Sequence, residues 1–298
     1  MRLGHFEIKA INTGMFKLDG GAMFGTVPKP MWEKAISPDE MNRIPMALRL
    51  ILLRDHQTKR NLLVDTGIGR KWPEKLEKIY SIDHSEENLE SALATEGLTP
   101  SDITDVILTH LHFDHAGGAT SKNSQGELIP TFPNAKYYIQ KDNFDWATRP
   151  NSREAASYLP ENFEPLVRSG SLIVCDGVKD FEAKIQWPGI SVVVSYGHTI
   201  GLQCPKITIE GRTFFYPSDL IPTSAHIPIP WVMSYDIHVI KILDEKESVL
   251  QRATQEDWIV IYEHDPKVPA SRVHKGAKHY EAGSALSADL QSLAPLQL

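Results

Sequence analysis

Residues 109–118 read Thr-His-Leu-His-Phe-Asp-His-Ala-Gly-Gly, and they decide how the rest of the chain is interpreted. They follow the apolar run 105–108, so side chains of metal-ligand type are expected where a buried strand ends and the chain turns. Histidine and aspartate side chains at such density, if buried, each need a hydrogen-bond partner or a compensating charge. A bound cation would provide that compensation, so the stretch predicts a metal site.

The spacing of these ligands suggests how they divide. In an extended segment His110 and His112 point the same way and can reach one cation, while a turn after His112 can direct Asp114 and His115 toward a second. Imidazole combined with carboxylate suits Zn²⁺, although Mn²⁺, Fe²⁺ and Co²⁺ also accept such ligands. The two glycines at 117 and 118 allow the backbone to fold tightly away from the site.

Working outward, short apolar and β-branched runs predict strands at 6–11, 47–53, 61–64, 105–108, 136–139, 172–175, 190–195, 206–209, 213–216 and 258–262. Helices are predicted at 73–80, 86–96 behind an N-cap at Ser85, 141–148 and 236–254. Strands occur in runs and also alternate with helices, which favours an α/β fold of two mixed sheets sandwiched between outer helices, a four-layer αββα arrangement. No repeat or flexible linker divides the sequence, so residues 1–298 are interpreted as one domain.

The segment 14–45 is dense in glycine and proline, which predicts little regular structure, yet it carries many methionine and aromatic side chains. It must therefore pack on something. Two interpretations stay open: a loop that covers the edge of the sandwich, or an apolar wall over a substrate pocket, in which Met23, Phe24 and Trp32 would contact the substrate. The same apolar side chains could instead form the contact of a homodimer.

Composition excludes several classes of function. The net charge of −7 argues against nucleic acid as a partner, because binding to phosphates needs clustered Lys and Arg. No stretch approaches the roughly 18 apolar residues of a membrane span, and the first ten residues lack the apolar run of a signal peptide, so a cytoplasmic enzyme with a small-molecule substrate is expected. Cys175 and Cys204 are too few for a disulfide framework and are predicted to be buried thiols.

The pattern HxHxDH followed by Ala-Gly-Gly resembles the signature of hydrolases with the metallo-β-lactamase fold. Four further motifs are similar to those of the family and occur in the expected order: Val-Asp-Thr-Gly at 64–67, Gly-His-Thr-Ile-Gly at 197–201, Ser-Asp at 218–219 and Glu-His-Asp at 263–265. Together they extend the resemblance over most of the chain.

This resemblance implies a centre with two divalent metal ions, zinc being preferred. One ion would be held by His110, His112 and His198, the other by Asp114, His115 and His264, with Asp219 bridging them. A hydroxide between the two metals would be the nucleophile, and Asp114 would relay a proton to the leaving group. Asp65 is expected to fix a histidine tautomer or the turn, and not to bind a metal.

The bridging aspartate weighs against class B β-lactamases, which lack it. The pattern with this aspartate is similar instead to the branch of the family that contains acyl-homoserine lactonases, organophosphate hydrolases, glyoxalase II and RNase Z. Acidic charge weighs against RNase Z. Glyoxalase II has a basic helical segment at its C-terminus, whereas the tail 272–298 contains Lys275 and Lys278 but ends in a featureless stretch. Residues 17–25 resemble the start of lactonase-like members, so hydrolysis of a small ester-like substrate, preferably a lactone, is expected.

Alternatives remain a phosphodiester or organophosphate hydrolase, a thioesterase resembling glyoxalase II, and an iron-dependent oxidoreductase of the same fold. Well-studied lactonases also place a tyrosine three residues after the bridging aspartate, where this chain has Pro222. The oxyanion would then depend on the metals or on Tyr216, Tyr235 or His226. Pro222 and His226 are themselves predicted to face the substrate.

Overall fold

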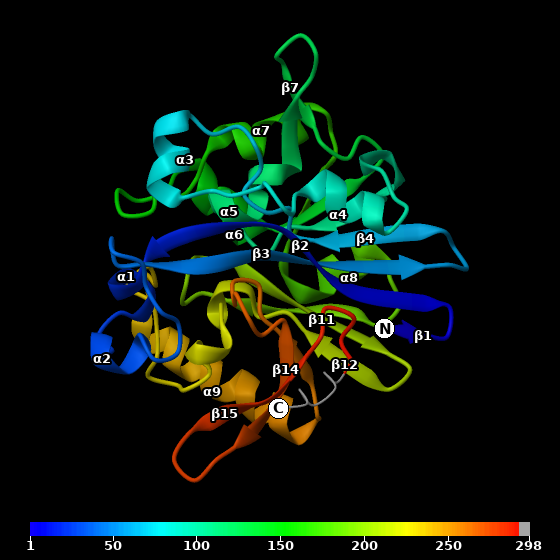
Figure 1. Cartoon of the computed structure of the whole chain (residues 1–298). Coiled ribbons are helices and arrows are strands. Elements are labelled where there is room, and N and C mark those ends of the chain that lie inside the picture. Colours follow the sequence, from blue (N-terminus) through cyan, green and yellow to red (C-terminus); the bar gives the residue numbers. More distant parts are fainter. Residues whose placement is uncertain (292–298) are drawn as a thin grey trace.

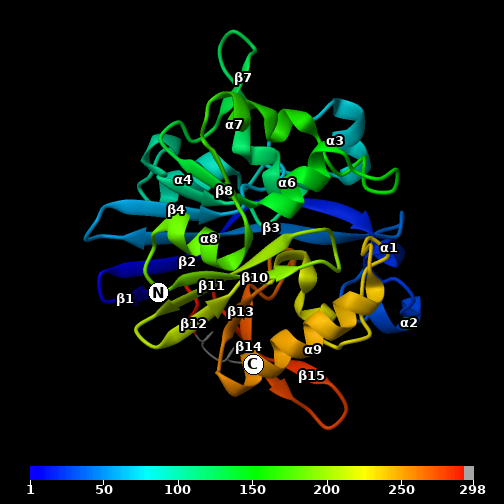
Figure 2. The same ribbon diagram turned by 180° about the vertical axis from the view of Figure 1, so that it is seen from behind.

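Two mixed β-sheets lie face to face with helices on their outer surfaces in this computed structural model, which describes residues 1–291 (Figures 1 and 2). The αββα sandwich predicted from the sequence is confirmed. Within the described residues, no helix has both the length and the apolar character needed to cross a membrane.

The first sheet has the strand order β1-β2-β3-β4-β5-β8-β9. Its strands are β1 (Arg2–Leu3), β2 (Phe6–Asp19), β3 (Arg43–Asp55), β4 (Arg60–Val64), β5 (Asp105–Ile107), β8 (Lys136–Gln140) and β9 (Leu172–Cys175). The first four are paired antiparallel, and from β4 onward the pairing is parallel.

The second sheet has the order β10-β11-β12-β13-β14-β15. Its strands are β10 (Ile190–Ser195), β11 (Leu202–Ile209), β12 (Arg212–Phe215), β13 (Ile259–Ile261), β14 (Ala270–Lys275) and β15 (Tyr280–Leu286). Only the pairing of β12 with β13 is parallel within this sheet. A separate small hairpin joins β6 (Thr120–Lys122) and β7 (Leu128–Pro130).

Helices cover both outer faces (Figure 2). Those beside the first sheet are α3 (Glu74–Tyr80), α4 (Leu89–Thr95), α5 (Phe113–Ala116), α6 (Lys141–Thr148) and α7 (Glu164–Arg168), whereas the long α9 (Val239–Gln255) lies under the second. The helix α8 (Gly177–Ile185) packs against β9 and β10 and so links the two sheets at one edge.

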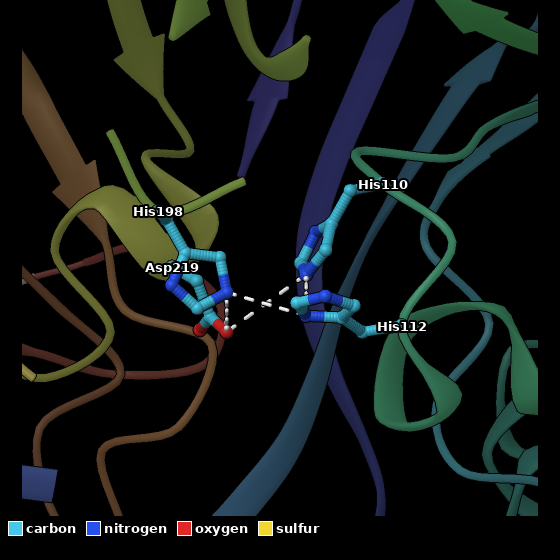
Figure 3. Close-up of side chains that lie close together, drawn as sticks. All are labelled: His110, His112, His198 and Asp219. Atoms are coloured by element: carbon cyan, nitrogen blue, oxygen red, sulfur yellow. Dashed lines mark hydrogen bonds and ion pairs between the residues drawn. The ribbon is translucent and has the colours of Figure 1, made fainter. Parts of the chain in front are cut away.

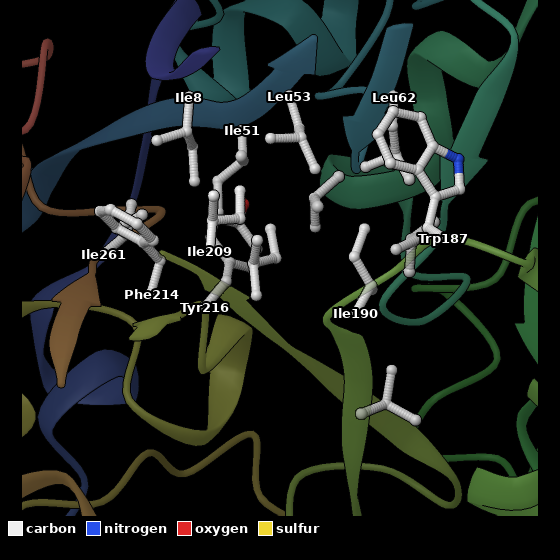
Figure 4. Close-up of a cluster of buried hydrophobic side chains, with 14 of the residues drawn as sticks. Ile8, Ile51, Leu53, Leu62, Trp187, Ile190, Ile209, Phe214, Tyr216 and Ile261 are labelled. Atoms are coloured by element: carbon white, nitrogen blue, oxygen red, sulfur yellow. The ribbon is translucent and has the colours of Figure 1, made fainter. Parts of the chain in front are cut away.

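The main core lies between the sheets (Figure 4). Ile51 and Leu53 of β3 face the second sheet, whereas Leu50 and Leu52 face the outer helices, because successive side chains of a strand point to opposite faces. Both faces of β3 are therefore buried, which explains its continuous apolar sequence.

The prediction for segment 14–45 was wrong about its local structure. Residues 15–19 continue β2 and pair with 43–47 of β3 beyond an irregularity at Asn12/Met15, since a bulge lets the strand resume its pairing. The short helices α1 (Gly20–Phe24) and α2 (Lys29–Trp32) follow, and the Asp19 carboxylate caps α1 by accepting the Ala22 N–H.

Other boundaries also differ from the prediction. The helix expected from residue 86 starts at Leu89, because Asn88 and not Ser85 forms the capping box. The hairpin of β14 and β15 near the C-terminus and the helix α8 were not predicted. Residues 292–298 of that tail lie outside the described part of the chain.

Candidate metal centre

The predicted metal ligands meet at one edge of the sandwich, between the two sheets. His110 and His112 follow β5, His198 follows β10, Asp219 follows β12 and His264 follows β13, so each comes after the C-terminal end of a strand. The single turn α5 carries Asp114 and His115. All of these side chains are buried, and the strand ends hold them in fixed directions.

The first group consists of His110, His112, His198 and Asp219. Figure 3 shows His110 and His112 facing His198 and Asp219 across a narrow gap. The His112 Nδ1 lies 3.0 Å from the His110 Nε2 and 3.3 Å from the His198 Nε2, which in turn lies 3.1 Å from the Asp219 Oδ2. Three ring nitrogens and one carboxylate oxygen thus point at a common position.

The second group consists of Asp114, His115 and His264. The Nε2 atoms of His115 and His264 are 3.4 Å apart, and the Asp114 Oδ2 is 3.6 Å from the His264 Nε2. Asp219 contacts this group as well: its Oδ2 is 3.4 Å from the His115 Nε2 and its Oδ1 is 3.3 Å from the His264 Nε2. Asp219 therefore stands between the two groups, as expected of a bridging ligand.

In His198 and His264 the ring nitrogen that faces away from the groups is occupied. The Nδ1 of His198 lies 2.9 Å from the Asp236 Oδ1, and the Nδ1 of His264 lies 2.8 Å from the Ala47 carbonyl oxygen. Because each outer nitrogen faces an acceptor, it carries the proton, and the inner nitrogen of a neutral ring presents its lone pair.

His115 is held by two carboxylates at once. Its Nδ1 lies 3.1 Å from the Asp65 Oδ2 and 3.0 Å from the Glu263 Oε2. Asp65 also accepts the Thr109 N–H at 2.7 Å and the Thr109 hydroxyl at 2.7 Å. The structure places Asp65 behind the ligands, where it orients His115.

The charges of the centre favour a cation. Burial lowers the pKa of His198, but the carboxylates of Asp219 and Asp236 outweigh it and raise the pKa to about 10. Burial likewise lowers the pKa of His264, while Glu263 and Asp219 raise it to about 9. The carboxylates thus stabilise positive charge near the rings of His198 and His264. In addition, the buried Asp219 Oδ1 has no hydrogen-bond partner within residues 1–291. Imidazole and carboxylate donors around such an orphaned oxygen fit divalent metal ions.

The loop of residues 65–69 fixes the turn that carries Asp114 and His115. Thr66 donates its N–H and its hydroxyl to the His115 carbonyl oxygen, at 2.9 and 2.7 Å. A Cβ added to Gly118 would lie 2.1 Å from the Thr66 carbonyl oxygen, so only glycine permits this approach.

The first sheet also supports His264, which follows a strand of the second sheet. The Ala47 N–H of β3 donates to the His264 carbonyl oxygen at 3.1 Å, and the buried Arg49 guanidinium donates to the carbonyl oxygens of Tyr262 and Asp265. The Pro222 carbonyl oxygen accepts the His264 N–H at 3.0 Å.

A cavity of about 360 Å³ adjoins the centre, and His112, Asp114, His198 and Asp219 form part of its lining. Apolar side chains contribute much of the remaining wall: Leu18, Met23, Met46, Phe113 and Met233. Polar groups are contributed by Tyr80, Arg153, Glu154, Ser157 and Tyr235.

Of the residues predicted to contact substrate, Met23 lines this cavity, but Phe24, Trp32, Pro222 and His226 are not part of its wall. Phe24 is fully buried and stacks on Trp32 at 5.3 Å and on His226 at 4.7 Å between ring centroids. The two ring nitrogens of His226 face the Thr223 hydroxyl and the Met23 carbonyl oxygen. These four residues therefore lie outside the lining of this cavity, and their contact with substrate stays a prediction.

Sequence reasoning missed several residues of the site. Glu154 lies 3.6 Å from the His112 Nε2 and accepts the Thr199 hydroxyl at 2.7 Å, and Asp236 holds His198. Neither residue belongs to a motif, so no local signal could identify them. Glu263 adjoins His264 in its motif, which is the one signal that pointed to it.

Of the three donors considered for the oxyanion, Tyr235 alone lines the cavity. The Tyr216 hydroxyl is buried and donates to the Arg49 carbonyl oxygen at 2.6 Å.

Comparison with known proteins gives a consistent result. A family model described as the metallo-beta-lactamase superfamily matches residues 50–264. The N-acyl homoserine lactonase AiiB of Agrobacterium fabrum is 26% identical over 252 residues, which covers 80% of this chain and 86% of that protein.

Solved structures agree over nearly the whole length. A probable metal-dependent hydrolase from Staphylococcus aureus has a TM-score of 0.82 and 32% identity, with 96% of this chain and all of that chain covered. AidC, a dizinc quorum-quenching lactonase in complex with the product of its reaction, has a TM-score of 0.76 and 22% identity, with 95% of each chain covered. At that identity the likeness to AidC concerns the fold alone.

Proposed function

Since the chain belongs to the metallo-beta-lactamase superfamily and is a metal-dependent hydrolase, we propose that it binds two zinc ions and opens the ring of a small lactone. His110, His112 and His198 would hold one ion, Asp114, His115 and His264 the other, and Asp219 both. The convergence of these side chains, with the outer nitrogens of His198 and His264 engaged, supports this division.

Two bound divalent ions would supply a nucleophile from water near neutral pH and would polarise the carbonyl of the substrate. Residues of the chain would supply the proton transfer and the stabilisation of the oxyanion. Asp114 lines the cavity and would pass a proton to the leaving oxygen. Tyr235 lines the same cavity, and its hydroxyl is our candidate for the group that stabilises the oxyanion in place of the tyrosine that Pro222 replaces.

The lactone preference depends on one observation: the cavity next to the ligands has a largely apolar wall. An N-acyl lactone presents a compact polar ring and an apolar chain, so the ring would lie at the ligands and the chain along Leu18, Met23 and Met233. Similarity to AiiB, an N-acyl homoserine lactonase, supports the same substrate class.

The test is a screen of metal-loaded protein against N-hexanoyl homoserine lactone, a simple ester, a thioester, a phosphodiester and a phosphotriester. We expect the highest kcat/KM with the lactone. Asp219→Ala should lower it by about 1,000-fold, because the several kcal/mol that the metal ions supply to the transition state would be lost. His279→Ala, an exposed histidine far from any motif, is the matched control and should leave activity unchanged.

Two results would contradict the proposal. Preference for a phosphotriester or thioester would refute the lactone assignment while leaving the hydrolase intact. Full turnover by Asp219→Ala would refute the centre itself.

A further inference from the structure

Among the histidines of the first group, His112 alone has an outer ring nitrogen without a hydrogen-bond partner in residues 1–291. Its Nδ1 points at the common position of the group, so in the neutral ring the proton lies on the Nε2. This Nε2 is buried, and a buried N–H without an acceptor is unfavourable. A nearby acceptor would remove that cost and would also fix the ring.

Glu154 presents a carboxylate to this nitrogen. Its Oε1 lies 3.6 Å from the His112 Nε2, just beyond hydrogen-bond distance. A movement of about half an ångström would give a normal hydrogen bond. Glu154 is buried, with 4% of its surface exposed, and it also lines the cavity at the metal centre. The carboxylate could therefore act on His112 or on the substrate.

Three other donors fix the Glu154 carboxylate in place. The Trp146 indole N–H and the Asn151 side-chain amide donate to its Oε2, at 2.8 and 3.2 Å. The Thr199 hydroxyl donates to its Oε1 at 2.7 Å. The position of this carboxylate therefore does not depend on His112, so it can orient the ring.

Tyr158 connects the same network to the face of the His112 ring. The Tyr158 hydroxyl lies 2.6 Å from the Thr199 Oγ1, and it donates to Thr199 because the single O–H of Thr199 is already donated to Glu154. The ring centroids of Tyr158 and His112 are 4.6 Å apart. Thr199 itself directly follows the ligand His198. No hydrogen bond or ion pair of the described residues joins Glu154 to the second group, so its contacts concern the first group alone.

We propose that Glu154 is a positioning residue for His112, which accepts the Nε2–H of the ring and so directs the Nδ1 toward the first metal ion. This inference rests on the proposed division of the ligands between two ions. Partners of this kind typically contribute about 10- to 100-fold to metal affinity. Because Glu154 does not contact the second group, we expect its loss to affect one ion only.

Glu154→Gln is the variant that isolates this role. It keeps the volume of the side chain, and its amide oxygen should face the fixed N–H groups of Trp146 and Asn151, because the Thr199 hydroxyl can reverse and accept instead. The NH₂ group then faces His112, which loses its acceptor. Glu182→Gln, the same change on an exposed glutamate of α8, is the matched control.

Competition of the zinc-loaded protein with a chromophoric chelator tests the proposal, because it separates the two ions by affinity. We expect Glu154→Gln to bind one of its two zinc ions about 10- to 100-fold more weakly than the wild type and the other equally tightly. The second ion thereby reports that the fold is intact. With saturating zinc the variant should have the wild-type KM, and the absorption spectrum of its cobalt-substituted form should differ from that of the wild type. Glu182→Gln should match the wild type throughout.

Three results would overturn this role of Glu154. Wild-type affinity for both ions would show that His112 needs no such partner, and equal weakening of both would indicate a general loosening of the fold. A raised KM at saturating zinc with unchanged zinc affinities would show that Glu154 contacts the substrate instead. A wild-type protein that binds fewer than two zinc ions would refute the proposed centre, and this role with it.

Discussion

Asp236 determines which nitrogen of His198 faces the metal centre, since its carboxylate accepts a hydrogen bond from the Nδ1–H at 2.9 Å. Without that partner the ring can rotate or exchange tautomers, and its Nε2 no longer points reliably at the common position of the first group. Residues that orient ligands in this way affect metal affinity although they do not touch the metal.

We therefore expect Asp236→Ala to weaken binding of the metal ions by about 10- to 100-fold. Competition with a chromophoric chelator measures this. Asp244→Ala, an exposed aspartate on α9 without a contact to the centre, is the control. Equal affinity of the two variants would show that Asp236 does not orient His198.

Gly118 is required for packing and not for its backbone angles. A methyl group at this position would meet the Thr66 carbonyl oxygen at 2.1 Å, and both backbones belong to the support of His115. We expect Gly118→Ala to lower the free energy of unfolding by about 1–3 kcal/mol, the usual cost of overpacking. Chemical denaturation of the metal-loaded protein measures this free energy. An unchanged midpoint would mean that the loop of residues 65–69 shifts to accommodate the methyl group at little cost.

At the scale of elements, α9 holds the loop that forms one side of the cavity. The ammonium group of the buried Lys246 donates to the carbonyl oxygens of Pro228, Ile229 and Trp231, at 2.9, 3.2 and 2.7 Å. This loop leads directly to Met233 and Tyr235 in the cavity wall. The helix therefore stabilises the site through one side chain.

Lys246→Met keeps the bulk of the side chain but leaves these carbonyl oxygens unpaired. We expect a loss of about 3 kcal/mol in the free energy of unfolding, since each unpaired buried group costs about 1–3 kcal/mol and the loop can relax toward water. We also expect a higher KM, because the cavity wall becomes less fixed. Lys241→Met, an exposed lysine one turn earlier, serves as control, and identical melting of both variants would contradict this role.

The elements also show what sequence patterns can and cannot reveal. The apolar runs predicted the central strands well, and 141–148 matches α6, because periodicity reports burial on one face. The extension of β2 through Asp19 escaped prediction because it depends on pairing with a distant segment of β3. Local glycine and proline content could not reveal that pairing.

At the scale of the whole molecule, the site joins the two sheets. His110 and His112 come from the first sheet and His198, Asp219 and His264 from the second, so ligands of one centre bridge the sandwich. The motifs located these ligands because each follows a strand of its own. Glu154, Asp236 and the true wall of the cavity could not be predicted, since they reach the site only through the packing of loops. The homodimer stays a prediction.

Because the ligands bridge the sheets, metal ions should stabilise the entire fold. We expect removal of metal with a chelator to lower the melting temperature, and restored Zn²⁺ to raise it again, as mass action requires of a ligand that binds only the folded state. Differential scanning calorimetry measures both steps. If the chelator abolishes activity but leaves the melting temperature unchanged, the metal ions do not stabilise the packing of the two sheets.

The most direct test of the whole account is a crystal structure of the zinc-loaded protein with anomalous diffraction recorded at the zinc edge. We predict two anomalous peaks, one among His110, His112 and His198 and one among Asp114, His115 and His264, with Asp219 contacting both. A single peak, or His198, Asp219 or His264 turned away from the peaks, would contradict it.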